Sequence, residues 1–241
     1  MGNKIPDLNA LNEIWNQGNK YFHAKDYHAA LKEFYKILQV KPHDPGTLLH
    51  YSASFAYLDR MVEAEQVCHN LLIIAPKWSN GYDLMGSILS MTSRKKEAIE
   101  HYNKSLELNP LLYQTRVNLC GLYIEENQNT EALEYALPLL DIAPDKAMTY
   151  FALAGAYLAL CDIDKAIECS RKGLSIEPGN DEMHSNLIFM MDLSGRYSMQ
   201  ELFEERKRWG EIHADPHYPK SPIDTALYGC YKELPYTPSG V

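Results

Sequence analysis

Residues 79–112 read SNGYDLMGSILSMTSRKKEAIEHYNKSLELNPLL, and this segment is one of a series that each end near a proline. The prolines recur at a constant interval of 34 residues, at Pro42, Pro76, Pro110, Pro144 and Pro178. Proline stops a helix because it lacks the backbone N–H and its ring clashes with the preceding turn. A stop at a fixed count indicates a stack of equal helix-turn-helix units, each buried only against its neighbours.

The prolines, taken as position 32 of each unit, define the repeats. These are 11–44, 45–78, 79–112, 113–146 and 147–180, followed by an atypical capping unit at 181–214 without the proline. Residues 1–10 are then a lead-in, and residues 215–241 form a C-terminal tail or linker. Each repeat is expected to hold one helix over positions 1–14 and a second over positions 15–31.

Two columns of small residues support this division. Position 20 is Ala30, Ala64, Ala98, Ala132 and Ala166, and position 8 is Gly18, Ser52, Gly86, Cys120 and Ala154. Two antiparallel helices need small side chains where their backbones approach closely. The same logic predicts close packing at Gly173.

Two local signals predict features of the second helices. Pro138 falls inside the second helix of the fourth repeat, where proline costs about 3 kcal/mol in an undisturbed helix, so we expect a kink there. The segment from Ser198 to Glu201 has the spacing of a capping box and predicts a helix start.

The pattern resembles the tetratricopeptide repeat, and the resemblance covers residues 11–214. It implies an all-α fold, a right-handed α-solenoid of five to six repeats with an irregular, proline- and tyrosine-rich C-terminal tail. In this family the first helix of each repeat lines a concave groove, with positions 2, 5, 6, 9, 12 and 13 directed into it. The candidate peptide-binding residues implied by these columns are Trp15, Asn16, Asn19, His50, Tyr57, Asn118, Phe151, Asn186 and Phe189.

Further members of the same columns are Leu49, Ala53, Asn80, Asp83, Leu84 and Met91, and we find no lysine or arginine in the set. Many co-chaperones of this family hold a partner's C-terminal carboxylate with lysine, asparagine and arginine. A buried carboxylate without a cation is unfavourable, so this groove is not expected to take such a tail.

Asparagine recurs at position 6, in Asn16, Asn118 and Asn186. This partial column is similar to the asparagine ladder of the O-linked N-acetylglucosamine transferase superhelix. An amide can donate to and accept from an extended peptide backbone. The alternative is that these are ordinary solvated helix residues.

The sixth unit carries a second resemblance, in SNLIF (185–189), ELF (201–203), Trp209 and His213. These residues look like the junction that leads into the catalytic domain of bacterial glycosyltransferases of the same transferase family, which use a UDP-sugar. Only 27 residues follow Ala214, and a nucleotide-sugar domain needs on the order of 100 or more. The catalytic domain is therefore expected to be absent from this chain.

The composition bears on partners and compartment. The formal net charge is −9 and the isoelectric point is about 5.5, which disfavours nucleic acid and anionic membranes and favours a neutral or basic partner. The 5 cysteines are odd in number and contain no CxxC pair, which favours buried free thiols. No apolar signal or membrane-spanning run is present in the sequence, and a cytoplasmic location is expected.

Motifs for catalysis are missing from the sequence: we find no glycine-rich phosphate loop, HExxH, nucleophile elbow or zinc-spaced cysteines. We therefore predict no enzyme activity, no cofactor and no metal site. The sequence favours a non-catalytic scaffold that binds a peptide or protein segment in its concave groove. The alternatives are the acceptor-recognition arm of an O-linked N-acetylglucosamine transferase-like enzyme and a pilus-assembly or secretion scaffold, and stacked terminal helices would allow a homodimer.

Overall fold

The computed structural model describes residues 8–214, and every regular element in that range is helical. The all-α prediction is therefore confirmed. The chain divides into two compact units, unit 1 up to Pro144 and unit 2 from Asp145 onward. Within the described range, no helix is both long and apolar enough to cross a membrane. The predicted tail at 215–241 lies outside the described residues.

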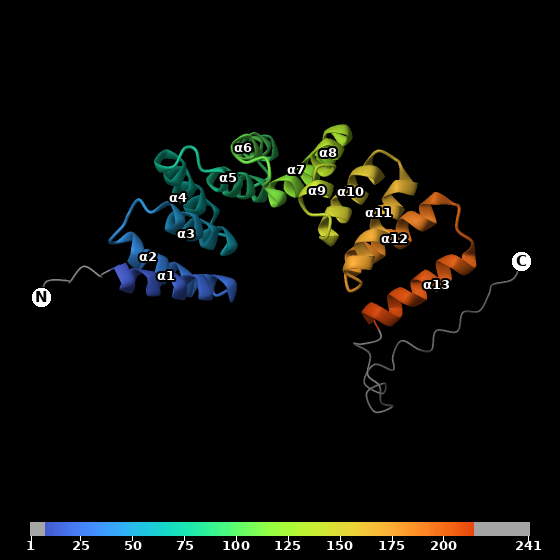
Figure 1. The fold of residues 1–241 in the computed structure, drawn as a ribbon, viewed down its shortest axis with the longest axis horizontal. Coiled ribbons are helices and arrows are strands. Elements are labelled where there is room, and N and C mark those ends of the chain that lie inside the picture. The colour runs from blue at the N-terminus through green and yellow to red at the C-terminus, as the bar shows by residue number, and fades with distance from the viewer. Residues whose placement is uncertain (1–7, 215–241) are drawn as a thin grey trace, which may run out of the picture. The chain divides into compact units, whose positions relative to one another are not determined.

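Unit 1 consists of consecutive helical pairs (Figure 1). Its helices are α1 (Leu8–His23), α2 (Tyr27–Leu38), α3 (Pro45–Tyr57), α4 (Met61–Ile74), α5 (Ser79–Met91), α6 (Lys95–Leu108), α7 (Tyr113–Glu125), α8 (Asn129–Ala136) and α9 (Leu139–Ile142). From α1 to α8, each helix packs against the next in the chain. Helix α1 begins at Leu8, inside the segment that the sequence assigned to a lead-in.

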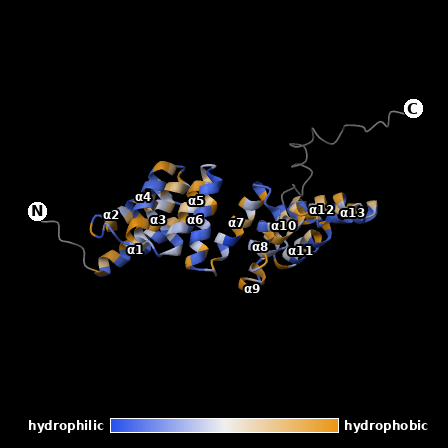
Figure 2. Ribbon diagram, turned by 90° about the horizontal axis from the view of Figure 1, so that it is seen from above, coloured by the Kyte–Doolittle hydropathy of each residue, from blue (hydrophilic) through white to orange (hydrophobic). Residues whose placement is uncertain are grey.

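Unit 2 consists of α10 (Ala147–Ala159), α11 (Ile163–Ile176), α12 (Asp181–Ser194), α13 (Met199–Trp209) and a closing π-helix, η1 (Gly210–Ala214). Its buried core gathers Ala166, Ile167, Leu187 and Met190 with their neighbours on these helices. Figure 2 shows that helices of both units carry hydrophobic and hydrophilic residues side by side, as amphipathic packing requires.

The turn inside each repeat has one recurring geometry. Position 15 lies in the left-handed backbone region in every repeat, at Lys25, Asp59, Ser93, Asn127 and Cys161 with φ of 58–61°, and at Gly195 with φ 64° in the sixth unit. In the first five repeats the N–H of position 16 bonds to the carbonyl of position 11, as from Asp26 to Tyr21 at 2.9 Å. This is the six-to-one bond of a Schellman motif. The second helix consequently begins at position 17 in these repeats, and the predicted start at position 15 is wrong.

The small-residue columns lie where the helices approach. All five alanines of position 20 have no exposed surface, which confirms the packing predicted for that column. A Cβ placed on Gly18 would lie 2.7 Å from the Phe34 ring, and one on Gly86 would lie 2.7 Å from the Tyr102 ring. Glycine at position 8 therefore makes room for an aromatic residue at position 24 of the same repeat.

The structure bears out the remaining local predictions. The second helix of the fourth repeat is interrupted at Leu137–Pro138, between α8 and α9. The Ser198 hydroxyl accepts the Glu201 N–H at 3.3 Å, while the Glu201 carboxylate accepts the Ser198 N–H at 2.7 Å. This is the predicted capping box. Gly173 packs directly against the sulfur of Met183, as its predicted close packing requires.

Candidate functional site: a groove in unit 1

The first helices of the repeats in unit 1 enclose a cavity of about 590 Å³. Among the residues that line it, three were predicted as peptide-binding, namely His50, Tyr57 and Asn118. The other groove columns contribute Leu49, Ala53, Asn80, Asp83, Leu84 and Met91. The groove-facing columns of helices α3 and α5 therefore converge on one cavity.

Several lining residues were not predicted from the sequence. These are Phe22, Ala56, Ser87, Ile88, Leu112 and Gln114. Phe22 and Ala56 occupy position 12 and Ser87 occupies position 9, so the groove columns contained the signal for them. Gln114 occupies position 2 of the fourth repeat, which is also a groove column, whereas Ile88 at position 10 and Leu112 at position 34 lie outside these columns.

An aromatic cluster lies against one side of the cavity, and its members His50 and Phe22 belong to the lining. The His50 ring lies 5.0 Å from the ring of Trp15, 5.4 Å from that of Phe22 and 5.7 Å from that of Phe34. Its Nδ1 lies 3.1 Å from the Gly46 carbonyl oxygen. A carbonyl can only accept, so Nδ1 carries the proton in this contact and Nε2 of the neutral ring is an acceptor.

Exposed apolar surface borders the same cavity. Tyr57 is 59% exposed and Met91 is 55% exposed, and both line the cavity. The Tyr57 ring stacks on Tyr27 with centroids 4.7 Å apart and also lies 5.8 Å from Phe22. This contact fixes the tyrosine ring at the cavity while leaving more than half of its surface available.

A polar network reaches the cavity through Asp83 and Ser87, which belong to its lining. The Thr115 hydroxyl donates to Asp83 Oδ1 at 2.6 Å, across 32 residues of sequence. Burial raises the pKa of the Asp83 carboxyl above its ordinary value, and the hydrogen bond from Thr115 opposes that rise. The Ser87 hydroxyl lies 3.1 Å from the Asp83 backbone oxygen and 3.0 Å from the Tyr102 hydroxyl.

Asn118 completes this network. Its Nδ2 donates to the Tyr102 hydroxyl at 3.1 Å, and its Oδ1 accepts from Gln114 at 3.0 Å. Each of these bonds uses part of the amide, which retains one N–H and acceptor capacity for a ligand. Tyr102 lies on α6, the second helix of its repeat, and is 2% exposed. The groove columns include only first helices, so they did not predict that Tyr102 lies beside the cavity.

The remaining predicted residues of unit 1 are not among those that line the cavity. Trp15 is half-buried and packs on His50 and Phe34. Asn16 is exposed. Asn19 is half-buried, and its buried Oδ1 has no hydrogen-bond partner among the described residues.

The predicted residues of unit 2 occupy different environments. Phe151 on α10 is half-buried and packs against the core of that unit. Asn186 and Phe189 on α12 are exposed, Phe189 to 57%. The helix places the two exposed residues three positions apart, on neighbouring parts of its surface.

A buried histidine links α12 to the end of unit 2. His184 is 1% exposed; its Nε2 lies 2.8 Å from Glu205 Oε1 and its Nδ1 lies 3.0 Å from His213 Nε2. Burial lowers the pKa of His184, while the hydrogen bond to Glu205 raises it. Trp209 donates to the Ser185 hydroxyl at 3.1 Å. Two residues that carried the second resemblance, Trp209 and His213, thus contact α12, the first helix of the sixth repeat.

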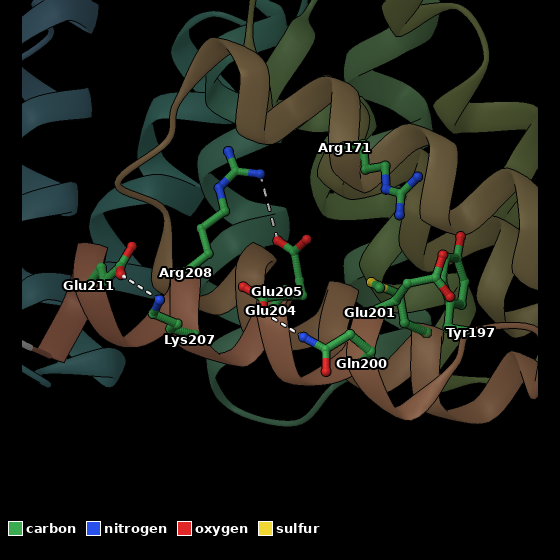
Figure 3. Close-up of a pocket in the computed structure, with 10 residues that line it drawn as sticks. Arg171, Tyr197, Gln200, Glu201, Glu204, Glu205, Lys207, Arg208 and Glu211 are labelled. Atoms are coloured by element: carbon green, nitrogen blue, oxygen red, sulfur yellow. Dashed lines mark hydrogen bonds and ion pairs between the residues drawn. The ribbon is translucent and has the colours of Figure 1, made fainter.

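Figure 3 shows a second hollow, in unit 2, of about 520 Å³. It lies along α13, and most of its labelled residues are charged. Opposite charges pair within it, Arg208 with Glu205 at 3.8 Å and Lys207 with Glu211 at 3.9 Å. Both side chains of the Lys207–Glu211 pair are exposed, and exposed pairs of this kind contribute little to stability.

Comparison with known proteins finds the same repeat in other proteins. Residues 79–110 and 148–180 match the family model described as tetratricopeptide repeat. The chain is 30% identical over 104 residues to the small glutamine-rich tetratricopeptide repeat-containing protein 2 of Mycosarcoma maydis, which covers 43% of this chain and 30% of that protein. It is 25% identical over 213 residues to the human protein O-mannosyl-transferase TMTC3, which covers 81% of this chain and 23% of that protein. The chain therefore spans less than a third of the length of either relative.

A solved structure shows the same fold. It is that of YrrB, described as a TPR protein with an unusual peptide-binding site, with a TM-score of 0.61 at 13% identity over 81% of this chain and 97% of that one. Helical pairs, repeat period and family match agree: the chain contains tetratricopeptide repeats and folds as tetratricopeptide-repeat proteins do.

Proposed function

We propose that this chain is a protein-interaction module that binds a peptide or protein segment in the cavity of unit 1. The observation that carries the proposal is the lining itself. Exposed apolar side chains, Tyr57 and Met91, stand beside polar groups, Asp83 and Asn118, on the first helices of successive repeats. Apolar anchors give affinity and convergent polar groups give orientation in binding sites of this kind.

The charge of the cavity supports a neutral or basic partner. No lysine or arginine is among its lining residues, and the whole chain carries a formal charge of −9. A partner's free carboxylate would find no cation there, so we do not propose that the groove takes an acidic C-terminal tail. We propose a non-catalytic role in the cytoplasm, and stacking of two copies as a further arrangement that light scattering of the purified chain would test.

The predicted residues have distinct proposed roles. Tyr57 and His50 supply aromatic surface, and Asn118 supplies a polar contact to a peptide backbone. Trp15 acts through its packing on His50. Asn16 and Asn19 on α1, with Phe151, Asn186 and Phe189 in unit 2, remain proposed contacts for segments that extend beyond the cavity.

The proposal is tested with peptides selected on the purified full chain from a random 12-residue library. Truncation of two exposed cavity residues, Tyr57→Ala with Met91→Ala, should weaken binding of the selected peptides at least about tenfold, as loss of anchor residues does. The matched control is Val62→Ala with Ile73→Ala, which removes two side chains that are each 67% exposed on α4. Equal binding by both double variants would contradict the proposed site.

A second candidate function has its own observation. The human relative that covers 81% of this chain is named as a protein O-mannosyl-transferase, and residues 185–213 resemble the junction before a glycosyltransferase domain. We therefore also propose, as the alternative, that these repeats recognise acceptor proteins for a sugar-transfer enzyme. An antibody against the repeats should then detect a native polypeptide much larger than 27.6 kDa, whereas a species of that mass supports the free-standing module.

A further inference from the structure

Among the residues that the structure describes, Asp83 is the one acidic residue that lines the cavity of unit 1, and no lysine or arginine lines it. Among the described residues, none of the ion pairs involves Asp83. Its Oδ1 accepts one hydrogen bond, from Thr115 at 2.6 Å. A carboxylate has acceptor capacity for about four such bonds, so most of it is left for a ligand or solvent.

Asp83 is half-buried, which strengthens the attraction between its ionised carboxylate and a cation. Removal from water raises the pKa of Asp83, and the one opposing contribution is the hydrogen bond from Thr115. An under-solvated carboxylate gains more from an opposite charge than an exposed one, because the surrounding dielectric is lower. A ligand that brings a positive charge therefore improves the environment of Asp83, whereas a ligand that brings a carboxylate worsens it.

The rest of the cavity supplies apolar surface that suits the stem of a long basic side chain. Leu49, Ala53, Leu84 and Met91 supply apolar surface to the same cavity as Asp83. Lysine and arginine bury an aliphatic stem along apolar surface and keep a charged head among polar groups. Both requirements are met within one hollow of about 590 Å³.

We infer that the cavity of unit 1 is a specificity pocket for a lysine or arginine side chain of the bound segment, with the cationic head on the Asp83 carboxylate and the stem along Leu84 and Met91. This inference rests on the proposed function, since it names the class of segment that the groove takes. Thr115 is a positioning residue, because its hydroxyl holds one carboxylate oxygen and leaves the other.

The competing explanation is a purely structural one, in which Asp83 only ties α5 to α7 through Thr115. Asp83→Asn separates the two. Its amide oxygen still accepts from the Thr115 hydroxyl, so the tie is retained, while the negative charge is lost. Asp141→Asn is the matched control, because it removes the same charge from an exposed position on α9 of the same unit.

The experiment selects 12-residue peptides from a random library on the immobilised full chain and on both variants, and then measures solution affinities of one selected peptide and its analogues. The analogues replace each lysine or arginine singly with norleucine or citrulline, which keep the stem and remove the charge. We expect selection to enrich basic residues next to apolar ones, and one neutral replacement to weaken binding at least about tenfold. Asp83→Asn should bind the parent peptide as weakly as wild type binds that neutral analogue, and Asp141→Asn should behave as wild type.

Two failures are distinguishable. The cation pocket is refuted, while the peptide groove stands, if selected peptides need Tyr57 and Met91 for binding but show no preference for basic residues. The same conclusion follows if Asp83→Asn retains a preference for basic residues. If no peptide binds the full chain, both the proposed function and this inference fail. The circular dichroism melting curve of Asp83→Asn checks that a loss of binding does not come from unfolding.

Discussion

Gly86 permits the aromatic packing on which the cavity depends, and its replacement by alanine tests this packing directly. A Cβ at this position would lie 2.7, 2.8 and 2.9 Å from three atoms of the Tyr102 ring. Tyr102 is 2% exposed, and its hydroxyl is hydrogen-bonded within the cavity network. The ring therefore cannot move aside without losing contacts on its far side.

The expected magnitude follows from opposing contributions. Overpacking a filled core costs about 1–3 kcal/mol, and displacement of the Tyr102 hydroxyl from one partner costs about 1 kcal/mol more. Alanine in place of glycine inside a helix contributes about 1 kcal/mol in the stabilising direction. The sum predicts that Gly86→Ala lowers the free energy of unfolding by about 1–3 kcal/mol.

Gly121 on α7 provides the matched control. A Cβ there meets no atom within 4 Å, so Gly121→Ala should stabilise the chain by up to about 1 kcal/mol. Urea denaturation followed by circular dichroism compares the two variants with the wild type. If Gly86→Ala is as stable as Gly121→Ala, the packing argument is wrong. A double-mutant cycle with Tyr102→Leu should show coupling, because the smaller side chain accepts the added methyl group.

Three further predictions concern other contacts. Thr115→Val removes the hydrogen bond that lowers the pKa of Asp83, so this pKa should rise above its wild-type value in a carboxyl NMR titration; an unchanged value would mean that the bond is absent in solution. Burial holds the pKa of His184 below its ordinary 6.5, so the unfolded chain binds the proton more readily and stability should fall as pH drops below 6.5. Denaturation midpoints between pH 7 and 5 should depend less on pH in His184→Asn, and identical slopes would count against a buried neutral imidazole. Ser198→Ala removes one half of the capping box with Glu201 and should cost about 1 kcal/mol of stability, measured by thermal melting.

Much of the fold was predictable because residues with a structural role recur at fixed positions of each repeat. Prolines at position 32 and alanines at position 20 fix where helices end and where they cross, and the alanines are fully buried. The left-handed residue of the turn was not predicted as a column, since only Gly195 and Asn127 are residue types that commonly adopt this conformation. Lys25, Asp59 and Cys161 adopt the same φ because the packing of the two helices requires it.

The candidate site was predictable in part. The groove columns predicted His50, Tyr57 and Asn118, and these three residues line one cavity because they lie on the same side of successive first helices. They could not supply Tyr102, which lies on a second helix, or Thr115, which reaches Asp83 from the following repeat. The groove columns also predicted Trp15 as an open groove residue, whereas edge-on packing on His50 and tilted packing on Phe34 leave it half-buried. Such contacts depend on tertiary packing between repeats, which spacing along one helix does not specify.

The central claim, that a partner segment binds in the cavity of unit 1, is tested most directly by site-specific photo-crosslinking on the full chain. The photoreactive residue p-benzoyl-phenylalanine replaces either Met91, which lines the cavity, or Val62, which is exposed on α4. Irradiation with a selected peptide, followed by mass spectrometry of the product, should give a covalent adduct at position 91 and none at position 62. An adduct at position 62 alone would place the binding surface on the second helices and contradict the account.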